Sequence, residues 1–313
     1  MKKYYYTFLI LFIGFNCFSQ QTIDDGKKIL EAYISPLAYS IGASMNNGWY
    51  NTAKPHKLGG FDITITLNTV IVPESAKSFN IDESNENTFS GGQTPTILGN
   101  SAGSNVTVIT NNVSSTTPMP KGLNIPIIPI PMLQAGVGLI KGTELDFRYM
   151  PEMKIGNSGN IGLYGFGVKH DILQWIPVAD MLPLDLSIQA GYTKLSTAVK
   201  LIDPTNTIEE PQSNLDIAAT TINLILSKKL LMFTPYISLG YNSTVTTFNV
   251  AGNYTVGNIE LNANNLTNIK FESNNNLKAN LGFRFNIALI ALQANYTFSK
   301  YPTATVGLGI SLR

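Results

Sequence analysis

Five charged side chains alternate with apolar neighbours along extended stretches of the sequence. They are Glu144, Asp146, Arg148, Lys278 and Arg284. Successive side chains of a β-strand point to opposite faces, so these charges share one face and the apolar residues share the other. We predict that they line the lumen of a barrel. They form either a charged constriction of a selective pore or internal ion pairs that fill a small barrel, and we favour the ion pairs.

Neither histidine lies in a motif for catalysis or metal binding. His56 and His170 are the two histidines, and the spacing of metal ligands surrounds neither of them. A hydrolase built on a barrel needs a serine, a histidine and a supporting polar residue brought together in space. His170 stands between Lys169 and Asp171 without an adjacent serine motif. We therefore predict a protein that is not an enzyme, with no catalytic residue, no metal and no cofactor.

The first residues have the pattern of an export signal. Lys2 and Lys3 give a positive start, residues 4–15 are apolar, and Cys17 and Ser19 are small residues at a spacing typical of cleavage. We predict a signal peptide at 1–19, cleaved after Ser19. A lipoprotein signal acylated at Cys17 is the weaker alternative, because a bulky and a polar residue precede the cysteine.

The composition is short of charge for a soluble surface. Charged residues make up 13% of the 313 residues and hydrophobic ones 44%. Loss of Lys2 and Lys3 would lower the basic count from 21 to 19 against 20 acidic residues, a balance that does not suggest nucleic acid as a partner. After Ser19 no apolar run approaches the roughly 20 residues of a spanning helix. The other structure that satisfies its backbone within lipid is a closed barrel.

Ten segments alternate between apolar and polar residues, the pattern typical of strands that cross a bilayer. They span 61–68, 133–139, 144–149, 164–169, 184–193, 217–227, 234–248, 277–286, 292–299 and 304–313. The predicted fold class is all-β, a transmembrane antiparallel β-barrel of about 10 to 12 strands with a short N-terminal helix. The alternative fold is a secreted soluble β-sandwich, in which the apolar faces of two sheets meet.

The predicted connections are short on the inner side and long on the outer side. With the C-terminus placed in the periplasm, inner turns fall at 141–142, 228–229 and 286–287, and outer loops fall at 151–160, 204–213 and 249–268. A longer inner connection at 171–182 is predicted to be interfacial.

Residues 74–131 become one large outer connection. A hidden hairpin around 96–110 would raise the strand count from ten to twelve. Prolines spaced through 118–131 exclude a central strand there. We favour an extended segment that packs on the barrel rim over an apolar lid.

A helix is predicted ahead of the barrel. Asp24 and Asp25 are placed to cap it, and apolar residues then recur at helical spacing, with a kink expected at Pro36. The predicted organisation is a signal peptide at 1–19, an N-terminal helical segment at 20–60 and a barrel at 61–313 with the loop at 74–131. The segment at 20–60 either plugs the lumen or lies against the inner opening.

Two stretches carry a resemblance to a known family. They are residues 46–62, NNGWYNTAKPHKLGGFD, and residues 167–177, GVKHDILQWIP. The chain resembles a family of uncharacterised outer-membrane barrel proteins from bacteria of the Bacteroidetes type, which implies an N-terminal helix leading into a barrel and implies no activity. It is more distantly similar to the long-chain fatty-acid channel family, in which an N-terminal segment enters the barrel. The chain lacks a match to that family's N-terminal motif.

These observations predict a protein of the outer membrane of a Gram-negative bacterium. The expected partners are outer-membrane lipid and the barrel-assembly machinery. The leading functional hypothesis is a narrow channel for small or hydrophobic molecules, whose solute is unknown. The alternative is a structural or surface-interaction barrel without transport activity, which the large outer connection and the Asn-rich stretch near Asn264 and 274–276 suggest.

Overall fold

The computed structural model describes most of the chain outside its first residues. The described residues are 20–84, 88–110, 113–154, 159–177, 182–200, 212–251, 253–256, 259–262, 269–273 and 277–312. The predicted signal peptide at 1–19 lies outside them, as do most of the predicted outer loop at 204–213 and much of the Asn-rich stretch.

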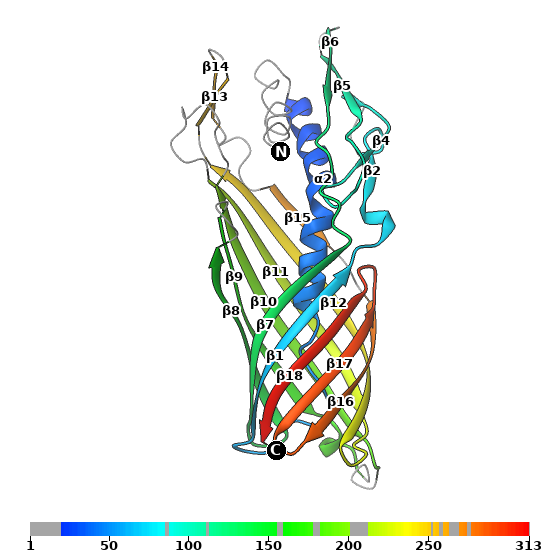
Figure 1. The fold of residues 1–313 in the computed structure, drawn as a ribbon, viewed down its shortest axis with the longest axis vertical. Helices are drawn as coiled ribbons and strands as arrows, with labels where there is room; N and C mark the ends of the chain where they lie inside the picture. Colours follow the sequence, from blue (N-terminus) through cyan, green and yellow to red (C-terminus); the bar gives the residue numbers. More distant parts are fainter. Residues whose placement is uncertain are drawn as a thin grey trace.

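Ten antiparallel strands form a closed barrel (Figure 1). Each strand pairs with its neighbour in the order of the chain, β1 pairs with β18, and the pairing of β11 with β12 closes the cylinder. The strands are β1 (Phe61–Ile71), β7 (Ile127–Gly138), β8 (Thr143–Lys154), β9 (Gly159–Asp171), β10 (Asp185–Lys200), β11 (Gln212–Ser227), β12 (Phe233–Ala251), β16 (Leu277–Ile287), β17 (Ile290–Phe298) and β18 (Thr303–Leu312). The predicted fold class is confirmed, and the ten predicted strands are the ten of the barrel.

The twelve-strand alternative is wrong. Alternation around 105–110 does mark a strand, β5 (Asn105–Thr110), but it pairs with β6 (Val113–Pro118) in a separate small sheet. One further strand, β15 (Ile269–Ser273), pairs with β12 beyond the part that β16 reaches. The hairpin of β13 (Asn253–Val256) and β14 (Ile259–Asn262) also stands outside the barrel sheet.

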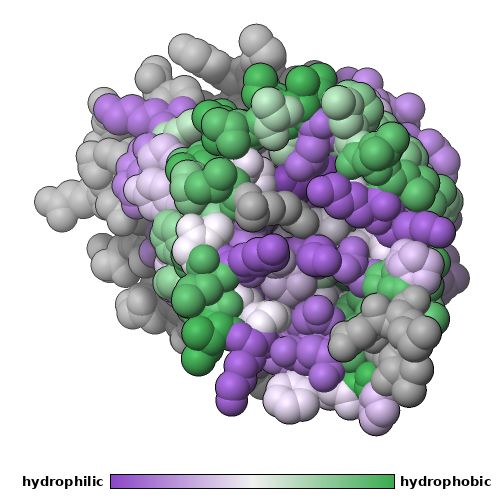
Figure 2. Space-filling view, turned by 90° about the horizontal axis from the view of Figure 1, so that it is seen from below, coloured by the Kyte–Doolittle hydropathy of each residue, from purple (hydrophilic) through white to green (hydrophobic). Residues whose placement is uncertain are grey.

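The polarity of the barrel is inverted relative to a soluble protein. Along β1 the polar residues from Asp62 to Asn68 are buried, whereas Ile63 and Ile65 are 49% and 64% exposed. The same alternation runs along β16, where Leu281 is 57% exposed while Asn280 and Arg284 are buried. Seen from the lower end, hydrophilic residues gather near the middle and hydrophobic ones mostly toward the outline (Figure 2). The apolar faces do not meet one another, so the β-sandwich alternative is wrong.

The predicted N-terminal helix is α2 (Gln20–Asn46), and at 27 residues it is longer than expected. It is already helical at Gln20, ahead of the predicted caps at Asp24 and Asp25, and it continues through Pro36. The helix begins above the upper rim and descends into the barrel, at the end opposite the C-terminus (Figure 1). Its lower end is bonded to the inner wall of the barrel, and it enters from the side of the long connections. In the described part of the chain, no helix combines the length and apolarity needed to cross a membrane.

Residues 72–126, which we call the cap, fold onto the upper half of α2. The cap contains η2 (Glu74–Ala76), β2 (Ser78–Asn80), β3 (Phe89–Ser90), β4 (Gln93–Pro95), β5 and β6. Its apolar side chains form one cluster with the helix and the upper barrel wall, and this cluster includes Ile29, Leu30, Ile34, Ile81, Phe89, Val106, Met150 and Leu195. Tyr33 donates a hydrogen bond to the Lys121 carbonyl oxygen at 3.3 Å, and burial raises the pKa of Tyr33 to about 12.

Two prolines lie inside a barrel strand, contrary to the prediction for 118–131. Pro129 and Pro131 belong to β7 and pair with Thr69 and Leu67 of β1. The pairing of β7 with β8 starts only at Leu133, so the upper part of β7 has one partner strand. A proline is tolerated where one side of a strand is free, because the missing N–H then leaves no gap in a ladder.

The lower connections are tight, as the predicted inner turns require. A two-residue turn joins β16 and β17 at Ala288 and Leu289, two residues later than predicted. Lys141 and Gly142 both adopt positive φ in the turn between β7 and β8, the geometry of a hairpin turn whose twist matches that of its strands. The connection after β9 contains η3 (Leu173–Trp175), whose Trp175 is 64% exposed.

Candidate functional site in the barrel lumen

All five predicted lumen residues are buried, with exposed fractions between 0% and 4%. Glu144, Asp146 and Arg148 come from β8, and Lys278 and Arg284 come from β16. They do not form one ring. Arg148, Lys278 and Arg284 bind the chain segment inside the barrel, whereas Glu144 pairs with a lysine of β9 near the lower mouth.

Two buried cations bind the C-terminal end of α2. The Arg148 guanidinium donates to the carbonyl oxygens of Met45 and Asn47, both at 2.8 Å. The Lys278 ammonium donates to the Asn46 carbonyl oxygen at 2.8 Å and to the Asn47 side chain at 3.1 Å. The last carbonyls of a helix have no partner within it and carry a partial negative charge. Both cations therefore compensate the charge of the helix end and satisfy its free acceptors.

The amide of Asn68 on β1 completes this attachment. It donates to the carbonyl oxygens of Ser44 and Asn47, both at 2.9 Å, and its own oxygen accepts from Thr305 of β18 at 2.7 Å. We call Asn68, Arg148 and Lys278 the helix latch. It joins the end of α2 to strands β1, β8 and β16, which come from three different parts of the barrel wall.

Trp49 fixes the orientation of Arg148. The guanidinium carbon lies 3.8 Å from the centre of the indole ring, a distance typical of a cation–π contact. Gln134 bridges the two residues, because it accepts from Arg148 Nε at 3.0 Å and donates to the Trp49 carbonyl at 3.1 Å. Gly191 makes room for the ring, since a Cβ there would lie 2.5 Å from the indole.

Below the latch, residues 49–56 continue down the lumen and bond to its wall at almost every step. The polar side chains of several strands each take one group of this segment, and the pairs are Tyr50 with Ser238, Asn51 with Arg284, Thr52 and Ala53 with Ser227, and Ala53 with Ser187. The Asn51 contact to Arg284 Nη1 is 2.6 Å long. The N-terminal segment therefore occupies the lumen from the upper rim to the lower mouth.

A second polar network closes the lower mouth. Lys169 Nζ lies 2.7 Å from Glu144 Oε1, and His56 donates to Glu144 Oε2 through both its backbone N–H at 2.6 Å and ring Nδ1 at 2.8 Å. His56 Nε2 is 3.2 Å from Ser311 Oγ. We call these four residues the mouth network. Among the described residues, Asp146 Oδ2 is buried without a hydrogen-bond partner.

Sequence reasoning missed four members of these networks, which are Asn68, Lys169, His56 and Ser311. The alternating pattern could have placed Lys169 in the lumen, since it alternates with Val168 and shares the face of Gly165 and Gly167. No sequence pattern places His56 in the lumen, because it lies outside any alternating segment. The other histidine, His170, is half-buried at the lower rim, where it contacts Thr143 and Trp175. Within the described residues, no group of three or more histidine, cysteine or acidic side chains could hold a metal ion.

The fold and the lumen define a closed ten-strand β-barrel plugged by its own N-terminal segment. The chain belongs to the family described as "Family of unknown function (DUF6588)", whose model matches residues 1–312. A comparison with curated proteins gave no match. The Bacteroidetes source and the likeness to fatty-acid channels receive no support from these comparisons and stay predictions.

Three solved structures are similar to the chain at low identity. The translocator domain of the autotransporter NalP from Neisseria meningitidis is 11% identical, with a TM-score of 0.32, 95% of this chain and 100% of that chain covered. The β domain of the Bordetella autotransporter BrkA is 10% identical, with a TM-score of 0.30 and 82% and 98% covered. The outer-membrane channel DcaP of Acinetobacter baumannii is 10% identical, with a TM-score of 0.20 and 83% and 100% covered. Scores this low carry no weight for function.

Replacing Arg148 with methionine tests the helix latch. The substitution leaves two carbonyl oxygens of the helix end without their charged donor, so we expect the barrel to lose about 3 kcal/mol of stability. In a Trp175→Phe background Trp49 is the remaining tryptophan, and its emission should shift to the red as the ring loosens. The control is Lys229→Met at the exposed lower turn, which removes the same charge. Equal behaviour of the two variants would contradict the latch.

Proposed function

We propose that the protein is an integral outer-membrane β-barrel whose lumen is closed by the segment at 20–60, and that small solutes pass when this segment moves. The proposal rests on the groups that Arg148 and Lys278 bind. These cations bind the helix end instead of pairing with acidic residues of the wall. A barrel that needed only a filled interior could pair its charges within the wall, as Lys169 pairs with Glu144, which also accepts two hydrogen bonds from His56 of the inserted segment.

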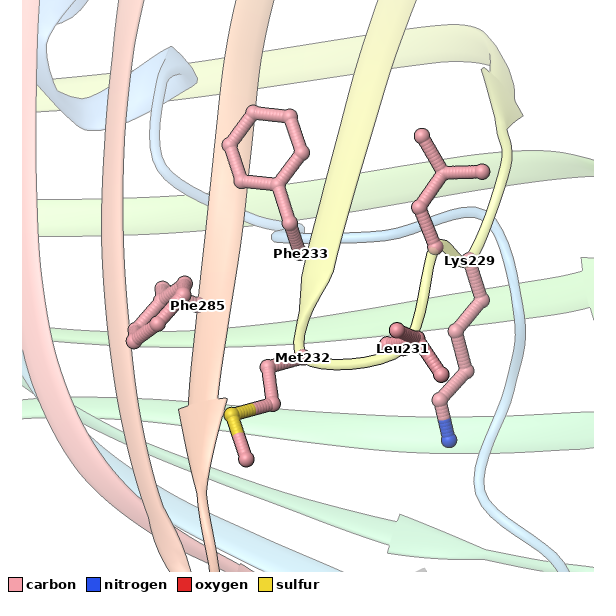
Figure 3. A pocket seen from close by; sticks show the side chains of 6 residues that line it. Lys229, Leu231, Met232, Phe233 and Phe285 are labelled. Atoms are coloured by element: carbon pink, nitrogen blue, oxygen red, sulfur yellow. The ribbon is translucent and has the colours of Figure 1, made fainter.

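Placement in a membrane is supported by the outward face of the strands. Apolar side chains are exposed on the outward face of every barrel strand, and each of these strands is nine or more residues long, the length that a tilted strand needs to cross a bilayer. At the lower turn, Met232, Phe233 and Phe285 surround an open hollow of about 820 Å³, with Lys229 beside them (Figure 3). Aromatic and basic residues together are typical of the boundary between lipid and water.

The orientation follows from the connections. Short turns of such barrels face the periplasm and long connections face outward, so the cap and the start of α2 lie on the cell surface. The outer-membrane lipid and the barrel-assembly machinery are then the expected partners.

The lining of the lumen indicates the solute class. Its lower half presents polar side chains such as Asn223, Gln293 and Asn295, which favour small polar solutes over hydrophobic ones.

The second candidate function is a structural or surface-interaction barrel without transport. It is favoured by the cap, whose apolar side chains pack in one cluster with α2 and the upper barrel wall. The folded cap offers a surface for interactions whether or not the lumen is open.

Replacing Leu281 with arginine tests placement in lipid. An arginine that faces the middle of a bilayer costs a barrel roughly 2–4 kcal/mol, whereas in water the same change of an exposed leucine is nearly neutral. Leu277→Arg at the upper end of the same strand is the matched control, since the cost falls near the interface. We expect a lower unfolding midpoint in lipid vesicles for the Leu281 variant alone. Two equal, small effects would contradict the membrane assignment.

Conductance across a planar bilayer tests the closed channel. Wild-type protein should be silent, because the segment at 20–60 fills the lumen. The double variant Arg148→Met and Lys278→Met should open intermittently, since the helix end loses both cations. Lys229→Met should stay silent as the control. Silence of the double variant and of a chain lacking 22–57 would instead support the structural or surface-interaction barrel.

Labelling of intact cells tests the direction in which α2 runs. An epitope inserted between Thr22 and Ile23 should bind antibody from outside, because the helix begins beside the cap (Figure 1). An epitope inserted between Ala288 and Leu289 should bind antibody only after the outer membrane is opened. The reverse pattern would show that the barrel is inserted upside down relative to our proposal.

A further inference from the structure

We propose that Ser311, His56 and Glu144 form a serine hydrolase site at the lower mouth of the barrel, which cleaves small carboxylic esters. This goes beyond the closed channel and does not depend on it. The three residues lie far apart in the sequence, on β18, in the lumen segment and on β8. No local motif links them, and the closed barrel with its inserted segment brings them together.

The hydrogen bonds set the proton positions that a hydrolase needs. A carboxylate only accepts, so His56 Nδ1, at 2.8 Å from Glu144 Oε2, carries the ring proton. His56 Nε2 then presents a lone pair, and the Ser311 hydroxyl donates to it at 3.2 Å. The order of nucleophile, base and carboxylate is that of a catalytic triad, which is recognised by geometry and roles, not by sequence position.

The base is held rigidly. The backbone N–H of His56 donates to the same carboxylate oxygen as its ring, so two bonds fix the ring relative to Glu144. Lys169 lies 2.7 Å from the other oxygen and keeps the carboxylate charged. His56 is 1% exposed and Glu144 is 2% exposed, so little water competes for these bonds.

The second histidine of the chain shows that this arrangement is specific. His170 Nδ1 lies 2.9 Å from Thr143 Oγ1, but its Nε2 accepts from the Trp175 indole at 2.9 Å. Nδ1 of His170 therefore carries the proton and donates to the threonine, so this ring cannot take a proton from that hydroxyl. A histidine and a hydroxyl side chain are paired here as well, but the ring nitrogen that faces the hydroxyl already carries the proton.

The surroundings of His56 indicate the class of ester. An open hollow of about 290 Å³ at the lower rim borders His56, whose side chain is itself buried, and Ser311 is not among its lining residues. The lining is basic at Lys54, Lys57 and Lys141, acidic at Asp171, and apolar at residues that include Leu139 and Ile140. Ser311 itself is 6% exposed, so access to the hydroxyl is narrow. An ester with a short apolar acyl group and an anionic part fits this lining.

The reaction conserves atoms and protons with water as the co-reactant. Ser311 Oγ attacks the carbonyl carbon while His56 Nε2 takes its proton, and the bond to the alcohol oxygen breaks as His56 returns that proton to the alcohol. A water molecule then attacks the acyl group and passes a proton to His56. The bond between the acyl carbon and Ser311 Oγ then breaks as His56 returns that proton to the oxygen, which releases the carboxylic acid and restores the serine hydroxyl.

The test uses the full chain in detergent micelles with two small probes. A fluorophosphonate should attach to Ser311, as peptide mapping by mass spectrometry would show, and p-nitrophenyl acetate should be hydrolysed. Ser311→Ala should abolish both signals. His56→Asn and Glu144→Gln should slow labelling roughly 100-fold or more, because the general base is lost or misoriented. His170→Asn is the matched control and should react like the wild type.

Folding is checked in every variant by the shift in gel mobility on heating. A chain that does not label at Ser311 would overturn the proposal, as would labelling that is unchanged by Ser311→Ala. Labelling of Ser311 at the wild-type rate in a folded His56→Asn variant would also overturn it, since the serine would then need no base. Each of these results leaves the conductance and membrane tests unaffected.

Discussion

The barrel wall presents its polar side inward, and the rest of the structure depends on that constraint. Where the interior is polar, the groups inside it are held mainly by hydrogen bonds, and each buried donor or acceptor without a partner costs free energy. The N-terminal segment supplies those partners. Its carbonyls and side chains accept hydrogen bonds from Arg148, Lys278 and Arg284 in addition to those that the wall accepts.

The interior is divided into two halves with different chemistry. The upper half is apolar, where α2 packs against the cap and against Met150, Leu163 and Leu195 of the barrel wall. The lower half is polar and runs from the helix latch to the mouth network. A helix suits the first half, because one segment buries an apolar surface while satisfying its own backbone. An extended segment suits the second, because its backbone groups remain available to the wall.

This division explains why the latch lies at the end of α2. The change from helix to extended chain leaves carbonyl oxygens without partners, and the wall provides two cations and an amide at that height. The attachment is therefore electrostatic and local, whereas the upper contact is hydrophobic and spread over many residues. Because the electrostatic attachment and the hydrophobic contact are separate, the lower segment can move while the helix stays packed under the cap. The family itself has no described function, so these contacts are the basis for assigning one.

The sequence by itself determined the ten strands, the direction in which their side chains point and the burial of all five charged candidates, because these features follow from a period of two residues along a single strand. Only the tertiary structure decided what the charges bind. Arg148 contacts a carbonyl 103 positions away and Lys278 one 232 positions away, and no local pattern encodes such distances. The same reason hid the position of His56 beside Glu144 and Ser311. It also hid the tolerance of Pro129, which depends on the missing partner strand and not on the residues around it.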